Sequence, residues 1–228
     1  MTKSNNLALF DLDHTLLPLD SDYHWADFLA RSGHVGDPDT ALRRNDELMQ
    51  RYNEGNLSAE ESFEFMLGLI ANRPLSELQQ WHAEYMRTII LPAITEAATN
   101  LLKTHQDNGD LCAIVTATNE FVTAPIAEAL GVPHLIATIP ERAGDFFTGR
   151  VAGVASYQAG KITRVDEWLQ SLGLQRDDFE RIWFYSDSIN DLPLLEAVSD
   201  PVATNPCPQL RAHATAKGWT ILDLFSTQ

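Results

Sequence analysis

Positive charge is scarce in this sequence. Lys and Arg account for 16 of its 228 residues, against 32 Asp and Glu, which gives a formal net charge of −16. Such an acidic surface repels the phosphates of nucleic acids and of anionic membranes. The composition therefore argues against nucleic-acid and membrane partners, and leaves a small anion, held at a local positive site, as a partner.

Cysteine and long apolar runs are scarce as well. The two cysteines, Cys112 and Cys207, form neither a disulfide framework nor a Cys/His metal-binding pattern, which indicates a reducing compartment. No apolar run approaches the roughly 20 residues of a membrane span, and residues 1–6 lack an apolar signal region. We therefore expect a cytoplasmic protein, and the sequence carries no signal for its oligomeric state.

What the sequence does contain is a regular alternation of strand and helix patterns. Apolar runs that indicate buried strands lie at residues 7–10, 111–115, 182–185, 201–203 and 219–222. Helical patterns between them lie at residues 93–104, 122–130, 162–172 and 192–198. This alternation predicts an α/β fold with a Rossmann-like open parallel sheet, helices on both faces, and ligands bound beyond the carboxyl ends of the strands.

One long segment interrupts the alternation. Residues 18–90 contain no strong strand pattern, and the sequence there predicts four helices, at about 23–33, 39–52, 58–70 and 76–90. We expect an all-helical cap at residues 18–90, inserted into a discontinuous catalytic core formed by residues 1–17 and 91–228. Within that core, glycines between short β-prone runs predict a hairpin in residues 137–155.

Acidic residues follow the first and third predicted strands. Asp11 and Asp13 come directly after the first strand, and Asp187 and Asp191 follow the third. If the four carboxylates converge at one edge of the sheet, so much buried negative charge requires a cation. The available ligands are all oxygens, so Mg²⁺ is the predicted cofactor. Taken separately, each pair could instead cap a loop or a helix N-terminus.

A hydroxyl and a lysine complete the candidate site. Thr116, followed by Ala117, is predicted to end the second strand beside a helix N-terminus, which is a suitable place for a phosphate. Lys161 lies at the start of a predicted helix, where a cation is locally unfavourable, so we expect a compensating anion or carboxylate nearby. The alternatives are simple helix capping by Thr118 or Asn119, and a solvated surface lysine.

Along the whole chain, the order acid pair, hydroxyl, lysine, acid pair resembles that of the haloacid dehalogenase-like (HAD) hydrolase superfamily. The strongest matches are the Phe-Asp-Leu-Asp-His-Thr-Leu segment at residues 10–16 and the Asp-Ser-Ile-Asn-Asp segment at residues 187–191. The chain is most similar to the phosphoserine-phosphatase-like group, subfamily IB, whose helical C1 cap follows the first strand, and in particular to a branch that includes histidinol-phosphate phosphatases. It departs from the common pattern at His14, where many members have glycine.

The resemblance implies a role for each of these residues. Asp11 would be the nucleophile that becomes an aspartyl-phosphate, and Asp13 the acid that protonates the leaving alkoxide and then deprotonates the attacking water. Thr116, Ala117 and Lys161 would hold the phosphoryl oxygens.

The same resemblance implies a metal site. Mg²⁺ would bind to Asp187, to Asp11 and to the backbone carbonyl of Asp13. Asn190 and Asp191 would support this arrangement by holding Asp187, the lysine or metal-bound water in place.

Substrate choice would then fall to the cap. Asp20 lies near the offset from the nucleophile at which phosphoserine phosphatases carry a glutamate that contacts the substrate amine, and Asp22, His24 and Arg43 are further candidates. Asp20 could equally be the N-cap of the first cap helix, and Arg43 a solvated side chain. Acids so close to the nucleophile favour a substrate that carries a cationic amine.

The sequence thus predicts a phosphatase, a Mg²⁺-dependent phosphomonoester hydrolase that acts on a small phosphorylated metabolite. The favoured substrate is an amino-alcohol phosphate such as histidinol phosphate, and phosphoserine is the alternative. A catalytically silent HAD-like module that binds a phosphorylated partner is a second alternative, although it would not need the acid/base residue Asp13. Dehalogenation ranks last, since Asp13 serves phosphoryl transfer and not haloacid chemistry.

Overall fold

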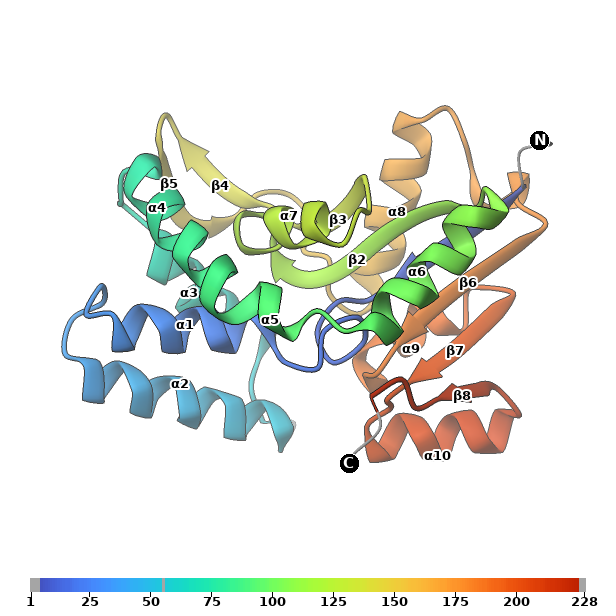
Figure 1. The fold of residues 1–228 in the computed structure, drawn as a ribbon, viewed down its shortest axis with the longest axis horizontal. Helices are drawn as coiled ribbons and strands as arrows, with labels where there is room; N and C mark the ends of the chain where they lie inside the picture. Colours follow the sequence, from blue (N-terminus) through green and yellow to red (C-terminus); the bar gives the residue numbers. More distant parts are fainter. Residues whose placement is uncertain (1–4, 55, 226–228) are drawn as a thin grey trace.

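The computed structural model of the protein describes residues 5–54 and 56–225. Its central element is a six-stranded parallel sheet with the strand order β3-β2-β1-β6-β7-β8 (Figure 1). The strands are β1 (Asn6–Phe10), β2 (Leu111–Asn119), β3 (His134–Thr138), β6 (Arg181–Ser186), β7 (Asp200–Thr204) and β8 (Thr220–Leu222). Because β1 lies in the middle and the order reverses beside it, a ligand crevice forms there. The predicted Rossmann-like α/β fold is confirmed.

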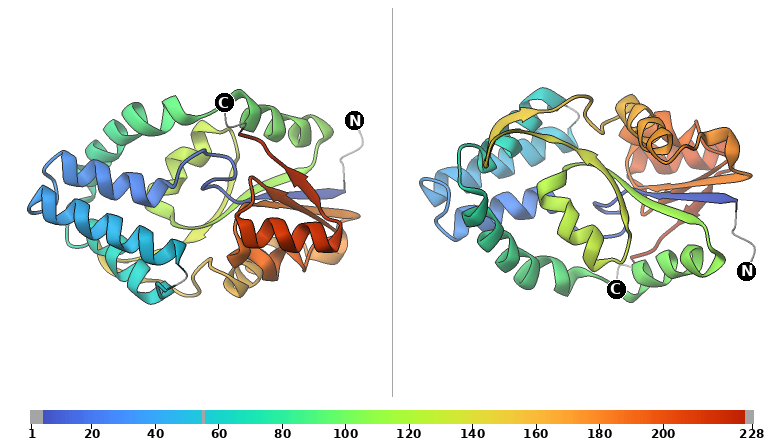
Figure 2. Two further views of the ribbon diagram at one scale, coloured as in Figure 1. Left: turned by 90° about the horizontal axis from the view of Figure 1, so that it is seen from below. Right: turned by 90° about the horizontal axis from the view of Figure 1, so that it is seen from above.

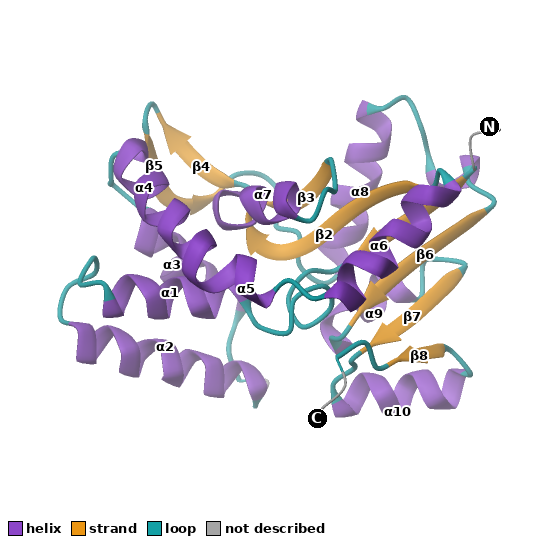
Figure 3. Cartoon of the chain, viewed as in Figure 1, coloured by secondary structure: helices purple, strands orange, loops and turns teal. Residues whose placement is uncertain are grey.

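Alternation along the strands gives each side chain a fixed face of the sheet. In β1, Ala8 and Phe10 belong to the apolar cluster under α6 and α7, whereas Leu7 and Leu9 belong to the cluster under α8, α9 and α10. These helices are α6 (Glu96–Asn108), α7 (Glu120–Ala129), α8 (Ala159–Ser171), α9 (Leu192–Leu195) and α10 (Pro208–Lys217). Figures 2 and 3 show them covering both faces of the sheet. The strand ends are therefore held from both sides.

The segment between β1 and α6 is helical, as predicted. Its helices are α1 (Ser21–Arg31), α2 (Pro38–Asn53), α3 (Ala59–Ile70), α4 (Leu75–Tyr85), a π-helical turn (Met86–Ile90) and α5 (Leu91–Ala93). They gather at one end of the molecule, beyond the carboxyl ends of the strands (Figure 2). Trp25 is fully buried among them, against the rings of Phe28, His82 and Tyr85.

A hairpin from the second half of the chain lies against this helical segment. It consists of β4 (Pro140–Ala143) and β5 (Phe146–Val151), and it packs on α3. The backbone N–H of Asn72 donates to the carbonyl of Phe147 at 2.9 Å. The division into a core at 1–17 and 91–228 and a cap at 18–90 stays a prediction. The hairpin is one of the parts of the proposed core that contact the proposed cap.

Three details differ from the sequence prediction. The strand β3 was not expected, because its five residues begin with His134 and lead directly into the hairpin. β2 does not end at Thr116 but continues to Asn119, with a shift in its register against β3. Threonine is β-branched and prolongs a strand readily, which accounts for the extension through residues 116–118. α9 is shorter than predicted and ends at Leu195.

Candidate active site

A cavity of about 240 Å³ lies where β1, β2 and β6 end. Its floor carries the residues that the sequence singled out, and its other walls come from α1, α2 and α3. The predicted site residues that line it are Asp11, Asp13, Asp20, Asp22, Thr116, Ala117, Lys161, Asp187, Asn190 and Asp191. A cavity of this size suits a small metabolite better than a macromolecule.

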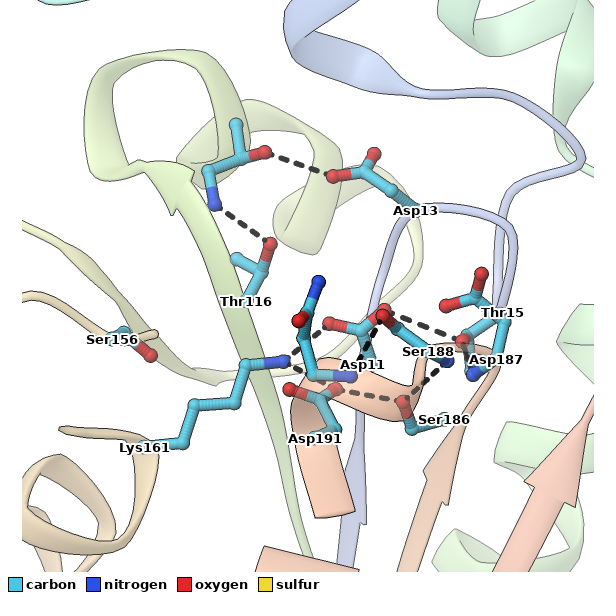
Figure 4. Close-up of polar contacts among 12 residues, drawn as sticks. Asp11, Asp13, Thr15, Thr116, Ser156, Lys161, Ser186, Asp187, Ser188 and Asp191 are labelled. Carbon is cyan, nitrogen blue, oxygen red and sulfur yellow. Dashed lines mark hydrogen bonds and ion pairs between the residues drawn. The ribbon is translucent and has the colours of Figure 1, made fainter. Parts of the chain in front are cut away.

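Lys161 is the positive centre of the cavity floor (Figure 4). Its side chain is only 2% exposed, and its Nζ donates to Oδ1 of Asp11 at 2.8 Å and to Oδ2 of Asp191 at 2.7 Å. Ser186 donates its hydroxyl to the same Oδ2 at 2.7 Å. Burial disfavours the charged ammonium, but the two carboxylates outweigh it and hold the pKa of Lys161 above its ordinary value. The compensating carboxylates expected near this lysine are thus present.

The local backbone explains how Lys161 reaches this position. Gly160 precedes it, and a Cβ at that residue would lie 2.2 Å from the carbonyl oxygen of Ala155, so no larger residue fits. The fully buried Ser156 ties the preceding loop to β3, because its N–H bonds to the hydroxyl of Thr138 at 3.1 Å. Sequence reasoning missed Ser156 and Ser186, although Ser186 directly precedes an acid at a strand end.

Asp11 and Asp187 face each other across the end of the sheet, linked through one hydroxyl. Thr15 donates to Oδ2 of Asp11 at 3.3 Å and accepts from the N–H of Asp187 at 3.1 Å. Burial raises the pKa of Asp11 to about 7, although Lys161 lowers it in part. Burial and the charge of Asp11 raise the pKa of Asp187 well above its usual value. Lys161 pairs with Asp11 and Asp191 but not with Asp187, so this site has an excess of negative charge.

Asp13 is held apart from that cluster. Its Oδ1 accepts from the N–H of Ser21 at 2.7 Å, in the first turn of α1, and its Oδ2 accepts from the hydroxyl of Thr118 at 2.8 Å. Burial, followed by the charge of Asp20, raises the pKa of Asp13 to about 6. The raised pKa favours the protonated form of this carboxyl group.

The residue between these acids and the insert has an unusual backbone. His14 has φ of +55°, in the left-handed region that favours glycine. The carbonyl of His14 accepts from Nδ2 of Asn205 at 2.9 Å, which fixes the turn. His14, which stands where many members of the resembling family have glycine, thus has a backbone conformation that suits glycine.

Some of the polar groups of the predicted phosphate site, residues 116–118, hydrogen-bond to one another. The buried hydroxyl of Thr116 accepts from the N–H of Thr118 at 3.2 Å, and both Thr116 and Ala117 line the cavity. The N-cap of α7 is Asn119, whose side chain accepts from the N–H of Val122 at 3.2 Å. Capping by Asn119, one of the alternatives to phosphate binding, therefore takes place without involving Thr116.

Acids dominate the wall nearest to α1. Asp20 is the N-cap of this helix and accepts from the N–H of Tyr23 at 2.7 Å. Oδ1 of Asp22 accepts from Nδ2 of Asn119 at 3.2 Å. Burial, and then the charges of Asp20 and Asp13, raise the pKa of Asp22 well above its usual value.

The remaining selectivity candidates lie outside the cavity. Arg43 is exposed and donates to the hydroxyl of Thr40 at 3.0 Å, while the ring of His24 packs edge-on against Tyr23. Arg51, another arginine of α2, makes a bidentate pair with Glu61. Among the described residues that line the cavity, Lys161 is the only lysine or arginine.

A metal fits the donor set, although not as three converging side chains. Among the described residues, no group of three or more His, Cys, Asp or Glu side chains has the arrangement of a metal site. Asp11 and Asp187 are two carboxylates with surplus negative charge, and the carboxylate of Asp13 is engaged with Ser21 and leaves only its backbone carbonyl. Oxygen donors of this kind suit Mg²⁺. Asn190 lies beside them and accepts from Gln158 at 3.4 Å.

Comparison with known proteins places these features in context. The sequence model of the haloacid dehalogenase-like hydrolases matches residues 8–196. The histidinol-phosphatase of Neisseria meningitidis serogroup C (strain 8013) is 38% identical over 219 residues, which cover 96% of this chain and 98% of that protein. In the described part of the chain, no helix has the length and apolar character that a membrane span requires.

Solved structures agree on the fold. A Bordetella pertussis Tohama I protein of unknown function superposes with a TM-score of 0.94 at 58% identity, covering 97% of this chain and 100% of that one. A substrate-bound phosphoserine phosphatase superposes with a TM-score of 0.69 at 18% identity, covering 98% of this chain and 94% of its own.

Proposed function

Since the chain belongs to the haloacid dehalogenase-like hydrolase family, we propose that it hydrolyses the phosphomonoester of a small amino alcohol, with histidinol phosphate as the substrate. The observation that carries the proposal is the buried group of Asp11, Asp191 and Lys161 at the floor of a cavity whose opposite wall is acidic. The first feature suits a phosphoryl group, and the second suits a cationic leaving group.

In the proposed reaction, Oδ2 of Asp11 attacks the phosphorus atom and becomes an aspartyl-phosphate. Lys161 orients Asp11 through Oδ1 and offsets the charge on the phosphoryl oxygens, helped by the adjacent residues Thr116 and Ala117. Asp13 protonates the leaving alkoxide and then removes a proton from the water that hydrolyses the intermediate. Its raised pKa, about 6, favours the acid form that the first step needs.

The residues that would hold Mg²⁺ are Asp11, Asp187 and the backbone carbonyl of Asp13, and the cation supplies neutralisation of the phosphoryl charge. Asp191 keeps Lys161 in place through its 2.7 Å contact, and Ser186 holds Asp191 in turn. We also propose that the protein works in the cytoplasm, which is consistent with its free cysteines, Cys112 and Cys207.

The choice between histidinol phosphate and phosphoserine follows from the charges on the cavity wall. Both substrates carry an ammonium group, and the carboxylates of Asp20 and Asp22 can accept hydrogen bonds from it. Phosphoserine also carries a carboxylate, and a buried carboxylate needs a cationic partner. Lys161 is committed to the phosphoryl end, and the arginines of α2 do not line the cavity. The apolar side chains of Leu48, Met49 and Phe63 suit an uncharged ring instead.

The test is hydrolysis of histidinol phosphate by purified protein with Mg²⁺ and with excess chelator, using Asp11→Asn as the blank for contaminating phosphatases. We expect turnover that requires Mg²⁺ and that is absent from the blank. Hydrolysis no faster than the blank would refute the proposal.

A further inference from the structure

Asn45 is a buried side chain of the cavity for which the mechanism above has no role. It lies in α2, is 2% exposed and lines the cavity. Its Nδ2 donates to the carbonyl of Tyr23 at 3.0 Å. Its Oδ1 accepts no hydrogen bond from any described residue. A buried acceptor without a donor is destabilising, so an external donor is expected to satisfy it.

Three N–H donors on this side of the cavity are already in use. Nδ2 of Asn119 binds Asp22, the N–H of Tyr23 binds Asp20, and Nδ2 of Asn45 itself binds a carbonyl. At Asp20, Asp22 and Asn45, this wall therefore offers a ligand a set of acceptor oxygens. A primary ammonium has three donors and no acceptor, which matches such a set, whereas a carboxylate or phosphate does not.

From this match, and given the proposed function, we propose that Asn45 is a specificity-determining residue whose Oδ1 accepts one N–H of the substrate ammonium, beside Asp20 and Asp22. The rise in the pKa of Asp22 on burial agrees with this assignment, because a bound cation would offset it. Asn45 would select for the amine and would have no part in the transfer of the phosphoryl group.

Two substrates that differ only in the amine test the assignment. They are histidinol phosphate and 3-(imidazol-4-yl)propyl phosphate, which lacks the amino group. The measured quantity is the ratio of their kcat/KM values. Asn45→Leu removes the acceptor and should lower this ratio roughly 10- to 100-fold, the value of a hydrogen bond to a charged group. Asn45→Asp also removes the donor to Tyr23 but retains an acceptor oxygen, so it should keep most of the ratio.

The outcomes separate the two proposals. An unchanged ratio in Asn45→Leu, or equal losses of the ratio in Asn45→Leu and Asn45→Asp, would overturn the role of Asn45 while leaving the phosphatase proposal intact. If wild-type protein hydrolyses neither compound, both proposals fail. Thermal unfolding of each variant reports on its folding, and Asn45→Ala carries the same expectation should the leucine variant not fold.

Discussion

The two ends of the cavity differ in how their polar groups are satisfied. At the end formed by the sheet, Lys161 binds both Asp11 and Asp191, and Ser186 supports Asp191. At the end formed by α1 and α2, which also carries Asp20 and Asp22, Oδ1 of Asn45 accepts no hydrogen bond from any described residue. The first end is preorganised by the protein, as suits a phosphoryl group common to all substrates. Under the proposed function, the second would be completed by its ligand, as suits the part of a substrate that must be recognised.

The largest effect should come from the sheet end. Asp11→Asn removes the nucleophile and should lower kcat by about 10⁴-fold or more, and to a similar extent for every phosphomonoester. Single-turnover kinetics on freshly purified protein measure this loss before deamidation can restore the acid. Asp145→Asn, which changes an exposed acid of the hairpin, is the matched control and should behave as wild type. Turnover in Asp11→Asn close to that of the control would contradict the mechanism.

A smaller effect, one that depends on the leaving group, is expected at Asp13. Asp13→Asn should slow phosphoryl transfer from an alkyl phosphate by about 10²–10⁴-fold, the usual value of general acid catalysis. p-Nitrophenolate leaves without a proton, so its phosphate ester should lose less in the same step. Rapid-quench measurement of both substrates gives the two losses. Equal losses would show that Asp13 does not act as the acid.

The acidic end should influence preference more than rate. Asp20→Ser retains an oxygen that can cap α1 but removes the carboxylate, so the stability of the helix should change little. The ratio of kcat/KM for histidinol phosphate over its amine-free analogue should fall roughly tenfold or more, the value of a charged hydrogen bond. An unchanged ratio would leave Asp20 as a helix cap alone.

The smallest effect concerns a contact between α4, in the proposed cap, and α7, in the proposed core. His82 of α4 donates its Nε2–H to the carbonyl of Val122 in α7 at 2.9 Å, and burial lowers its pKa below 6.5. The unfolded chain then binds more protons than the folded one between the lowered value and 6.5, so stability falls as the pH drops through this interval. His82→Gln can keep the donor but does not titrate.

Urea unfolding of both proteins at several pH values measures the difference. Wild type should lose more stability than His82→Gln between pH 7 and pH 5, the interval that spans the ordinary pKa of histidine. If the free energy of unfolding depends on pH in the same way in both proteins, the burial of His82 does not destabilise the fold at low pH.

The same contrast explains what the sequence could predict. The buried strands β1 and β6 are continuous apolar runs that end in acids, so their residues and the convergence of Asp11 and Asp187 were predictable. Lys161 was expected to have an anionic partner because a cation at a helix start is unfavourable, and its contacts with Asp11 and Asp191 agree.

The other end depends on packing between distant elements, which leaves no local pattern. Asn45 is one polar residue in an amphipathic helix, and nothing in its sequence neighbourhood distinguishes it from the exposed Arg43 two residues earlier. Which of the two faces the cavity follows from how α2 packs on α1. For the same reason β3 was missed, since its short run becomes a strand only through pairing with β2.

The most direct test of the account is an internal competition between histidinol phosphate and O-phosphoserine in one reaction with wild-type protein and Mg²⁺. At equal concentrations, the ratio of the two initial rates equals the ratio of the kcat/KM values, independent of active-enzyme content. Histidinol should form faster than serine, because the described residues that line the cavity offer acceptors for an ammonium and include no lysine or arginine besides Lys161 for a carboxylate. Faster release of serine would contradict it.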